Sequence, residues 1–234
     1  MKAITIFIEG IPSTYNDEGD DIKIENLSAI SESDAADLLR TVKLLFDKCG
    51  IRFSLAYGTL LGAVRDNGII KGDEDVDIFI DNESALYKNL PFLYENGLKV
   101  CRIYEHDLYS FHTNNDSFVD VYIKKELPFS IWNLWCDSFH NRAVPKRYTR
   151  KYDKRIFLGV ECNVPHKPER ILEFWYGKNW RIPVKGHNYT YETPSRYWWK
   201  TVAKPFIELI FSYLDFIVHN PLLSVKKLKK RILQ

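Results

Sequence analysis

Three aspartates at strand spacing are the residues of this chain best suited to chemistry. Residues 75–80 read Asp-Val-Asp-Ile-Phe-Ile, so Asp75 and Asp77 share one face of an expected strand whose other face is apolar. Asp120 alternates with valines on a second expected strand, residues 118–123. Carboxylates in this arrangement can direct their oxygens at a hard divalent cation. The sequence therefore predicts a Mg²⁺ (or Mn²⁺) site formed by Asp75, Asp77 and Asp120, of a kind that suits phosphoryl transfer.

A sharp turn precedes the aspartates in the chain. Gly58 and Thr59 interrupt an expected strand over residues 52–57 and lead into an expected short helix over residues 60–66. Backbone N–H groups at such a turn can point outward and bind phosphate. Arg65 on the following helix could bind a phosphate oxygen through the planar fork of its guanidinium group. The alternative is that Arg65 is an ordinary charged residue on a helix surface. Gly58, Thr59 and Arg65 are therefore the candidate substrate-binding residues.

The other elements follow from hydrophobic periodicity and from capping residues. We expect strands over residues 3–8, 98–104 and 108–113, a solvated acidic loop over residues 16–25, a helix from Ser31 or Ser33 to Lys48, and a helix from Pro168 that ends at Gly177. The aspartate-bearing strands would have one face for the core and one face that carries charge.

Composition excludes several classes of protein. The 234 residues are 45% hydrophobic and 27% charged, which fits a globular domain rather than a disordered chain. The net charge of +2 lacks the basic excess of nucleic-acid-binding proteins, so no nucleic-acid partner is expected. Four scattered cysteines form no zinc or disulfide pattern, and the first ten residues do not resemble a secretory signal. We therefore expect a cytoplasmic protein with reduced thiols.

The end of the sequence differs from the rest. We expect residues 1–195 to form the catalytic domain and residues 196–234 a helical appendage. An apolar stretch over residues 206–218 contains Glu208 and Asp215 and is too short for a bilayer span of ~20 residues. Residues 222–234 mix apolar residues with five basic residues and no acidic ones. This composition predicts peripheral binding to the anionic inner membrane surface, and the alternative is a pair of helices packed on the domain.

Several of these motifs resemble the signature of the LicD family. The resemblance is carried by residues 57–65, Ile70, residues 73–78, residues 118–121, Val164-Pro165, Leu172, Tyr176-Gly177, Trp180 and Pro183, in the family's order. It covers more than half of the chain. The resemblance implies an α+β nucleotidyltransferase fold, in which a small mixed sheet carries three carboxylates, helices pack around the sheet and a helical appendage follows.

The resemblance also implies an activity, because the family includes phosphocholine transferases and fukutin-type ribitol-phosphate transferases. We expect a metal-dependent transferase that moves a phospho-alcohol group from a CDP-activated donor to a hydroxyl of a surface glycan or lipid-linked glycan, such as lipopolysaccharide, capsule or teichoic acid. Asp120 would also help to deprotonate the acceptor hydroxyl. Two alternatives stay open: a nucleotidylyltransferase that adds NMP to a protein, RNA or sugar phosphate, and a non-catalytic scaffold for glycan-modifying enzymes.

Overall fold

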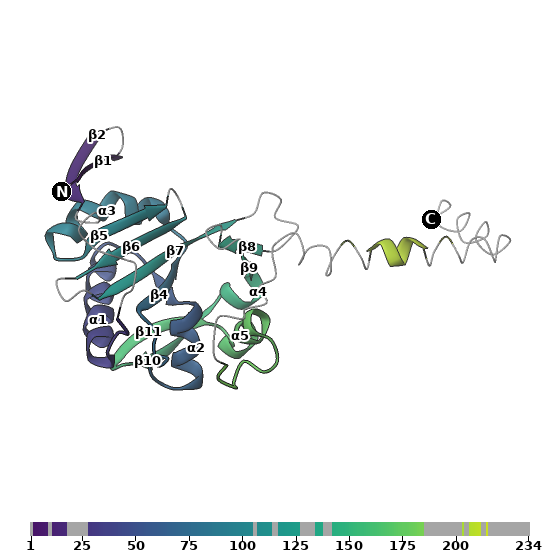
Figure 1. Cartoon of the computed structure of the whole chain (residues 1–234). Coiled ribbons are helices and arrows are strands. Elements are labelled where there is room, and N and C mark those ends of the chain that lie inside the picture. Colours follow the sequence, from purple (N-terminus) through teal and green to yellow (C-terminus); the bar gives the residue numbers. More distant parts are fainter. Residues whose placement is uncertain are drawn as a thin grey trace. The chain divides into compact units, whose positions relative to one another are not determined.

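The computed structural model describes residues 2–8, 11–17, 28–104, 107–113, 117–126, 134–137, 142–184, 203, 206–211 and 214. The chain divides into two compact units, Met1–Tyr191 and Glu192–Gln234. In the second unit, residues 206–211 form a helix (Figure 1). No helix among the described residues is both long enough and apolar enough to span a membrane.

A mixed sheet forms the centre of the first unit (Figure 1). Its main path runs in the order β3 (Phe53–Leu55), β4 (Asp75–Ile80), β7 (Phe118–Glu126), β6 (Leu108–His112) and β5 (Lys99–Tyr104). β4 and β7 pair in parallel, and the other neighbours on this path are antiparallel. The far end of β7 also pairs with β8 (Leu134–Asp137), which pairs with β9 (Arg142–Pro145). The protein is therefore of the mixed α+β class.

Two helices pack on the face of the sheet that carries Ile78, Ile80 and Val121. In α1 (Glu32–Lys48), the N-cap Ser31 accepts a hydrogen bond from the Asp34 backbone N–H, and Phe46 packs edge-on against Phe53 of β3. α3 (Glu83–Glu95) is held to the same face by a hydrogen bond of 2.9 Å from the Tyr109 hydroxyl to Glu83.

The opposite face carries the aspartates and is covered by α2 (Tyr57–Arg65) and α5 (Pro168–Tyr176). Aromatic rings fill the contact: Tyr57 lies 5.0 Å from each of Phe79, Tyr122 and Trp175, measured between ring centroids. We term these four residues the aromatic cluster. Gly177 ends α5 with a φ of 81°, and the buried Trp180 follows, as the sequence predicts.

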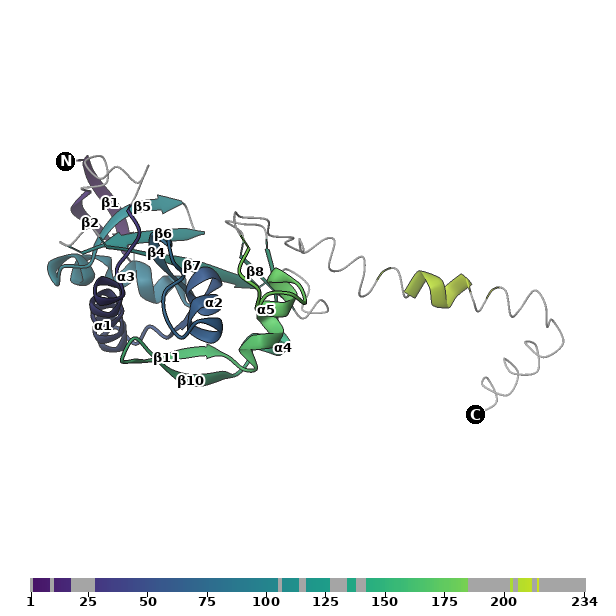
Figure 2. The same cartoon turned by 60° about the horizontal axis from the view of Figure 1, so that its bottom comes forward.

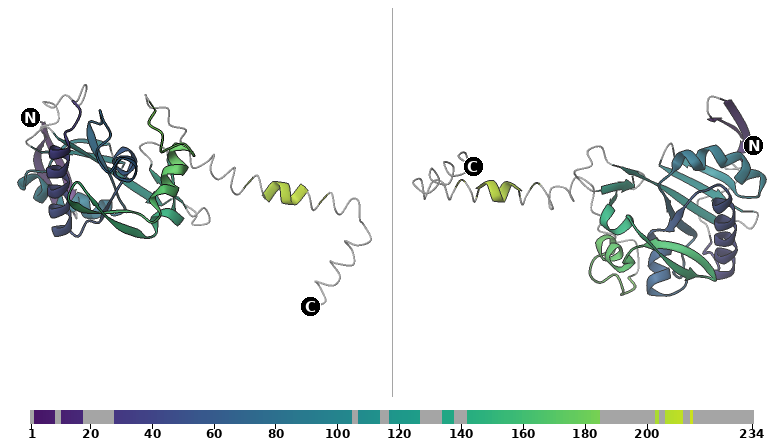
Figure 3. Two further views of the ribbon diagram at one scale, coloured as in Figure 1. Left: turned by 90° about the horizontal axis from the view of Figure 1, so that it is seen from below. Right: turned by 180° about the vertical axis from the view of Figure 1, so that it is seen from behind.

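Two further hairpins lie among the described residues, one of β1 (Lys2–Ile8) with β2 (Ile11–Asp17) and one of β10 (Tyr152–Phe157) with β11 (Val160–Pro165). β11 lies beside the edge strand β3, where the Asn163 side chain donates a 2.6 Å hydrogen bond to the Phe53 carbonyl. Figure 2 and Figure 3 show the β10–β11 hairpin running between α1 and the short α4 (Lys146–Thr149) with α5.

The structure confirms the expected strands at residues 3–8, 98–104 and 108–113 and the helix that ends at Lys48. Three predictions are corrected. The strand expected over residues 52–57 ends at Leu55, because the chain already turns into α2 at Tyr57. The aspartate-bearing face is not simply a charged surface, since Phe79 and Tyr122 on that face are buried in the aromatic cluster. The loop expected over residues 16–25 begins later than predicted, because Asn16 and Asp17 belong to β2, and residues 18–25 lie outside the described part of the chain.

Candidate functional site

The predicted carboxylates come together because β4 and β7 pair in parallel. Asp77 and Asp120 are direct partners in the register of these strands, and Asp75 lies two residues before Asp77 on the same face. The pairing continues across the sheet, where Ser110 of β6 lies opposite Asp120 and Arg102 of β5 lies opposite Ser110. One polar side chain from each of four neighbouring strands thus forms a continuous row on the face covered by α2.

The beginning of α2 holds Asp77 in place. The Gly58 backbone N–H donates a 3.0 Å hydrogen bond to Asp77 Oδ2, and the Asp77 backbone N–H donates a 2.8 Å hydrogen bond to Thr59 Oγ1. Thr59 is 1% exposed, so its hydroxyl is directed at the strand and does not face solvent. Tyr57, directly before Gly58, has a φ of +34°, a conformation that costs an L-residue about 1–2 kcal/mol. This strained turn directs the Gly58 N–H at the carboxylate.

A close approach explains the glycine at position 58. A Cβ built on Gly58 would lie 2.9 Å from Asp73 Oδ2 and 3.3 Å from Asp77 Oδ2. A side chain at this position would therefore push into two carboxylates. The same distances place Asp73 beside Asp77, although Asp73 was not among the predicted site residues.

The crowded carboxylates have raised pKa values. The pKa of Asp75 is raised to about 8, first by burial and then by the negative charges of Asp120 and Asp73. The pKa of Asp77 is raised well above its usual range, first by burial and then by Asp75 and Asp120. A cation bound among these side chains would relieve the repulsion that raises both pKa values.

The stability of the metal-free protein should depend on pH in a defined direction. Asp75 keeps its proton in the folded state up to about pH 8 but loses it near pH ~3.9 in the unfolded chain. The folded state therefore binds more protons between these values, and its stability should fall as pH rises through this window. Thermal melts in EDTA should show a lower melting temperature at pH 8 than at pH 5, and Asp75→Asn should reduce the difference. An unchanged pH dependence in Asp75→Asn would contradict the raised pKa.

Asp120 is held by two residues that sequence reasoning did not find. Arg102 Nη2 lies 2.9 Å from Asp120 Oδ2 and 3.2 Å from Oδ1, and Arg102 Nε donates a 2.9 Å hydrogen bond to Ser110 Oγ. The Ser110 hydroxyl in turn donates to Asp120 Oδ1 at 2.5 Å. The guanidinium thus supplies a positive charge inside an otherwise acidic row.

The predicted ligands Asp75, Asp77 and Asp120 fit a hard divalent cation, because their ligating atoms are carboxylate oxygens. The side chains are not, however, arranged as a ready-made ion cage: among the described residues, no three His, Cys, Asp or Glu side chains gather closely enough for one. The Asp120 oxygens instead engage Arg102 and Ser110. Binding of a cation by all three predicted ligands would require Asp120 to share or leave this contact.

Arg65 lies at the last position of α2, and its side chain forms an ion pair with the next residue, Asp66. Its Nε and Nη2 atoms donate to the two carboxylate oxygens of Asp66 at 2.8 and 2.6 Å, and its side chain is 11% exposed. A role in phosphate binding would require this planar fork to turn from Asp66 to the substrate.

The substitution Arg65→Lys separates the two roles of this residue. It keeps the positive charge but loses the fork, so phosphate binding predicts a fall in kcat/KM of about tenfold or more in transfer assays. A control, Arg170→Lys, alters an exposed arginine of α5 and should leave kcat/KM unchanged. Equal kinetics for Arg65→Lys and the unsubstituted protein would show that the Arg65 guanidinium does not bind the phosphate.

Comparison with known proteins agrees with the geometry of the row. The family model described as LicD/FKTN/FKRP, nucleotidyltransferase domain, matches residues 50–167, which include every residue of the row. The chain belongs to the LicD family. The predicted family is thereby confirmed, and the row belongs to its nucleotidyltransferase domain.

Curated relatives of this LicD chain include "Ribitol-5-phosphate transferase FKTN" of Mus musculus and of Homo sapiens, each 26% identical over 170 residues. Each match covers 69% of this chain and 36% of the relative, so the chain spans about a third of the length of these relatives. An uncharacterized protein of Rickettsia typhi is 34% identical over 105 residues, which is 39% of this chain and 34% of that protein.

The solved structures that match part of this chain include that of the lincosamide antibiotic adenylyltransferase LnuA with lincomycin bound. It has 11% sequence identity and a TM-score of 0.43, and the match covers 62% of this chain and 85% of that one.

Proposed function

We propose that this chain transfers a phospho-alcohol group, such as phosphocholine or an alditol phosphate, from a CDP-activated donor to a glycan hydroxyl. The observation that carries the proposal is the pairing of Asp77 with Asp120, in register, within the domain that defines the family. The naming of two relatives as ribitol-5-phosphate transferases supports a phospho-alcohol as the transferred group.

In this proposal Asp75, Asp77 and Asp120 hold Mg²⁺ (or Mn²⁺). When bound, the ion supplies positive charge that neutralises the phosphate oxygens of the donor. The acceptor oxygen forms a bond to the transferred phosphorus, the bond from that phosphorus to CMP breaks, and Asp120 accepts the hydroxyl proton. Gly58 and Thr59 act on Asp77, which they hold through the hydrogen bonds described above, and Arg65 contacts the diphosphate.

A donor screen tests this function. The purified chain is incubated with a panel of CDP-alcohols, a glycan acceptor and Mg²⁺ or Mn²⁺, and CMP release is measured. We expect CMP release with one class of CDP-alcohol and labelling of the acceptor by the alcohol phosphate. With a nucleoside triphosphate in place of the CDP-alcohol, release of pyrophosphate together with an acceptor that carries the nucleotide would instead identify the nucleotidylyltransferase alternative. A chain that binds no divalent metal would support the scaffold alternative.

We also propose that the C-terminal segment brings the enzyme to an anionic membrane surface, where a lipid-linked acceptor would be confined. Within the described part of the second unit, Phe206, Leu209 and Phe211 are more than 60% exposed. The basic residues 222–234 lie outside the described residues. Exposed apolar side chains followed by basic ones are typical of segments that lie in the lipid interface.

Truncation after His219 tests the membrane proposal. The full chain should sediment with liposomes that contain anionic lipid at low salt, and the truncated chain should stay in the supernatant because it lacks the basic residues. CMP release to a soluble acceptor should be unchanged by the truncation. If the full chain does not sediment with such liposomes, the proposal that the C-terminal segment binds a membrane is wrong.

A further inference from the structure

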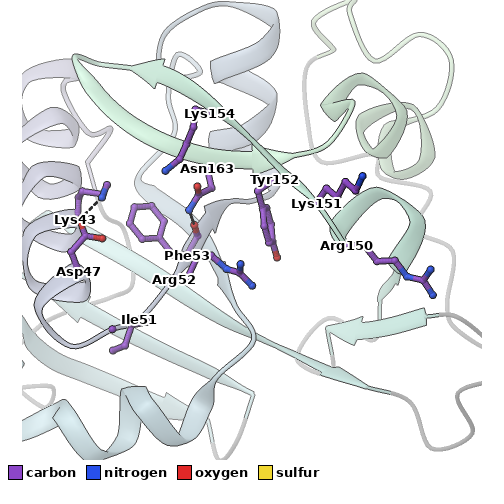
Figure 4. A pocket seen from close by; sticks show the side chains of 11 residues that line it. Lys43, Asp47, Ile51, Arg52, Phe53, Arg150, Lys151, Tyr152, Lys154 and Asn163 are labelled. Carbon is purple, nitrogen blue, oxygen red and sulfur yellow. Dashed lines mark hydrogen bonds and ion pairs between the residues drawn. The ribbon is translucent and has the colours of Figure 1, made fainter.

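A basic pocket lies outside the row of carboxylates, between α1, β3 and the β10–β11 hairpin (Figure 4). Its volume is about 620 Å³, which is in the range of small-molecule sites, ~300–1,000 Å³. The charged side chains that line it are five cations and one carboxylate: Lys43, Arg52, Arg150, Lys151, Lys154 and Asp47. Its lining therefore has a charge opposite to that of the aspartate row.

The pocket is separated from the aspartate row by the aromatic cluster. Along β7, Asp120, Tyr122 and Lys124 share one face, and Tyr122 belongs to the aromatic cluster. Four residues of strand place Lys124 about 13 Å from Asp120 along the sheet. The Lys124 ammonium donates a hydrogen bond to the hydroxyl of Tyr152, which lines the pocket. A phosphate in the pocket would thus contact a different group of residues from one held at the row.

The Tyr152 ring forms one wall of the pocket and lies between two cations. The Arg52 guanidinium stacks 5.0 Å from the centroid of the Tyr152 ring, and Lys124 lies 5.1 Å from the same centroid. Lys124 is 3% exposed, so one cation is buried behind the ring while Arg52 borders the cavity. Figure 4 shows Arg52 and Tyr152 between Lys43 and Lys154 on one side and Arg150 and Lys151 on the other.

Three of the pocket cations, Lys43, Arg52 and Lys154, form ion pairs with which an anionic ligand can compete. Lys43 pairs with Asp47, Arg52 lies 3.4 Å from Asp81, and Lys154 lies 3.1 Å from Glu161. Arg52 and Lys154 are each about 60% exposed in these pairs, and exposed pairs contribute only ~0–1 kcal/mol. An anion with several negative charges can therefore compete with these carboxylates.

We propose that this pocket binds a phosphate-bearing ligand of the size of a sugar. Cations on both sides of Tyr152 favour a ligand with two separated anionic groups over a single ion, and arginine and lysine are common ligands of phosphate. The cavity volume leaves room for a ring between the two groups. The proposal is independent of the reaction at the aspartate row, because it concerns binding alone.

Calorimetric titration of the full chain in EDTA tests the pocket. The probes are fructose 1,6-bisphosphate, inorganic phosphate and fructose, and the absence of divalent metal removes the cation through which the aspartates are proposed to bind a phosphate. We expect the bisphosphate to bind about tenfold or more tightly than inorganic phosphate and fructose not to bind. Equal affinity for phosphate and bisphosphate would contradict the proposal that the ligand is the size of a sugar. If neither binds, the proposal of a phosphate-binding site is wrong.

Two charge-reversal variants locate the binding. Arg150→Glu/Lys151→Glu changes two exposed side chains of the pocket, and Lys88→Glu/Lys178→Glu makes the same change in charge at exposed positions elsewhere. The pocket variant should weaken bisphosphate binding about tenfold or more, and the control variant should keep it. Equal losses of bisphosphate affinity in the two variants would show that net charge alone causes the effect, and would contradict binding in the pocket. Hydrogen exchange provides a second measurement: bisphosphate should protect residues 150–154 of the unsubstituted protein, and no protection there would contradict the site.

Discussion

Asp77→Asn is expected to remove transfer activity while leaving the protein folded. The substitution deletes one charge from the predicted metal site and keeps the shape of the side chain. Because a bound metal supplies several kcal/mol of transition-state stabilisation, we expect kcat to fall by about 10³-fold or more. The measurement is CMP release at saturating Mg²⁺. Near-normal turnover would contradict the assignment of Asp77.

The same substitution should not destabilise the metal-free protein through charge. Burial and the charges of Asp75 and Asp120 raise the pKa of Asp77, so its ionised form is unfavourable in the folded state. Replacing it by a neutral amide removes this repulsion, and the melting temperature in EDTA should be equal or higher. Asp37→Asn, an exposed position on α1, is the matched control and should change neither activity nor melting temperature by a large amount.

Arg102→Gln is expected to have the largest effect on metal-free stability. Arg102 contacts both carboxylate oxygens of Asp120, whose side chain is only 8% exposed. Removing the guanidinium leaves a buried carboxylate without its countercharge. Because the Arg102 side chain is itself 27% exposed, we expect a loss of about 2 kcal/mol in the free energy of unfolding in EDTA, less than for a fully buried pair.

Divalent metal should partly reverse this loss. If Mg²⁺ and Arg102 neutralise the same carboxylate, Mg²⁺ should raise the melting temperature of Arg102→Gln more than that of the unsubstituted protein. Arg170→Gln removes an exposed partner of Glu173 and should show the ordinary response. An identical response to Mg²⁺ in Arg102→Gln and in the unsubstituted protein would show that the ion binds away from Asp120.

The sequence was sufficient to predict the residues that lie on one strand, because alternation along a strand is a local property. Asp75 and Asp77 share a face for this reason, and the register of β4 with β7 then brings Asp120 beside Asp77. The helix α1 was equally predictable, since Ser31 and the acidic first turn mark its beginning.

The two residues that hold Asp120, Arg102 and Ser110, were not predicted, although strands were expected over the segments that carry them. Arg102 and Ser110 join the row only because β5 pairs with β6 and β6 pairs with β7, and no local pattern specifies that register. The early beginning of α2 has a similar cause, because Gly58 and Thr59 form hydrogen bonds with Asp77, which lies 19 residues after Gly58 and 18 residues after Thr59. α3 contains Pro91, which interrupts the local helical signal although packing keeps the helix intact.

Binding of Mn²⁺, followed by electron paramagnetic resonance, tests the central claim most directly, because free Mn²⁺ gives a strong signal that is lost on binding. The central claim is that Asp75 and Asp77 of β4 and Asp120 of β7 hold the catalytic divalent ion. We expect the unsubstituted chain to reduce the free Mn²⁺ signal with one ion bound per chain, and Asp77→Asn to lose this binding while Asp37→Asn retains it. Equal Mn²⁺ binding by Asp77→Asn and the unsubstituted chain would contradict the claim.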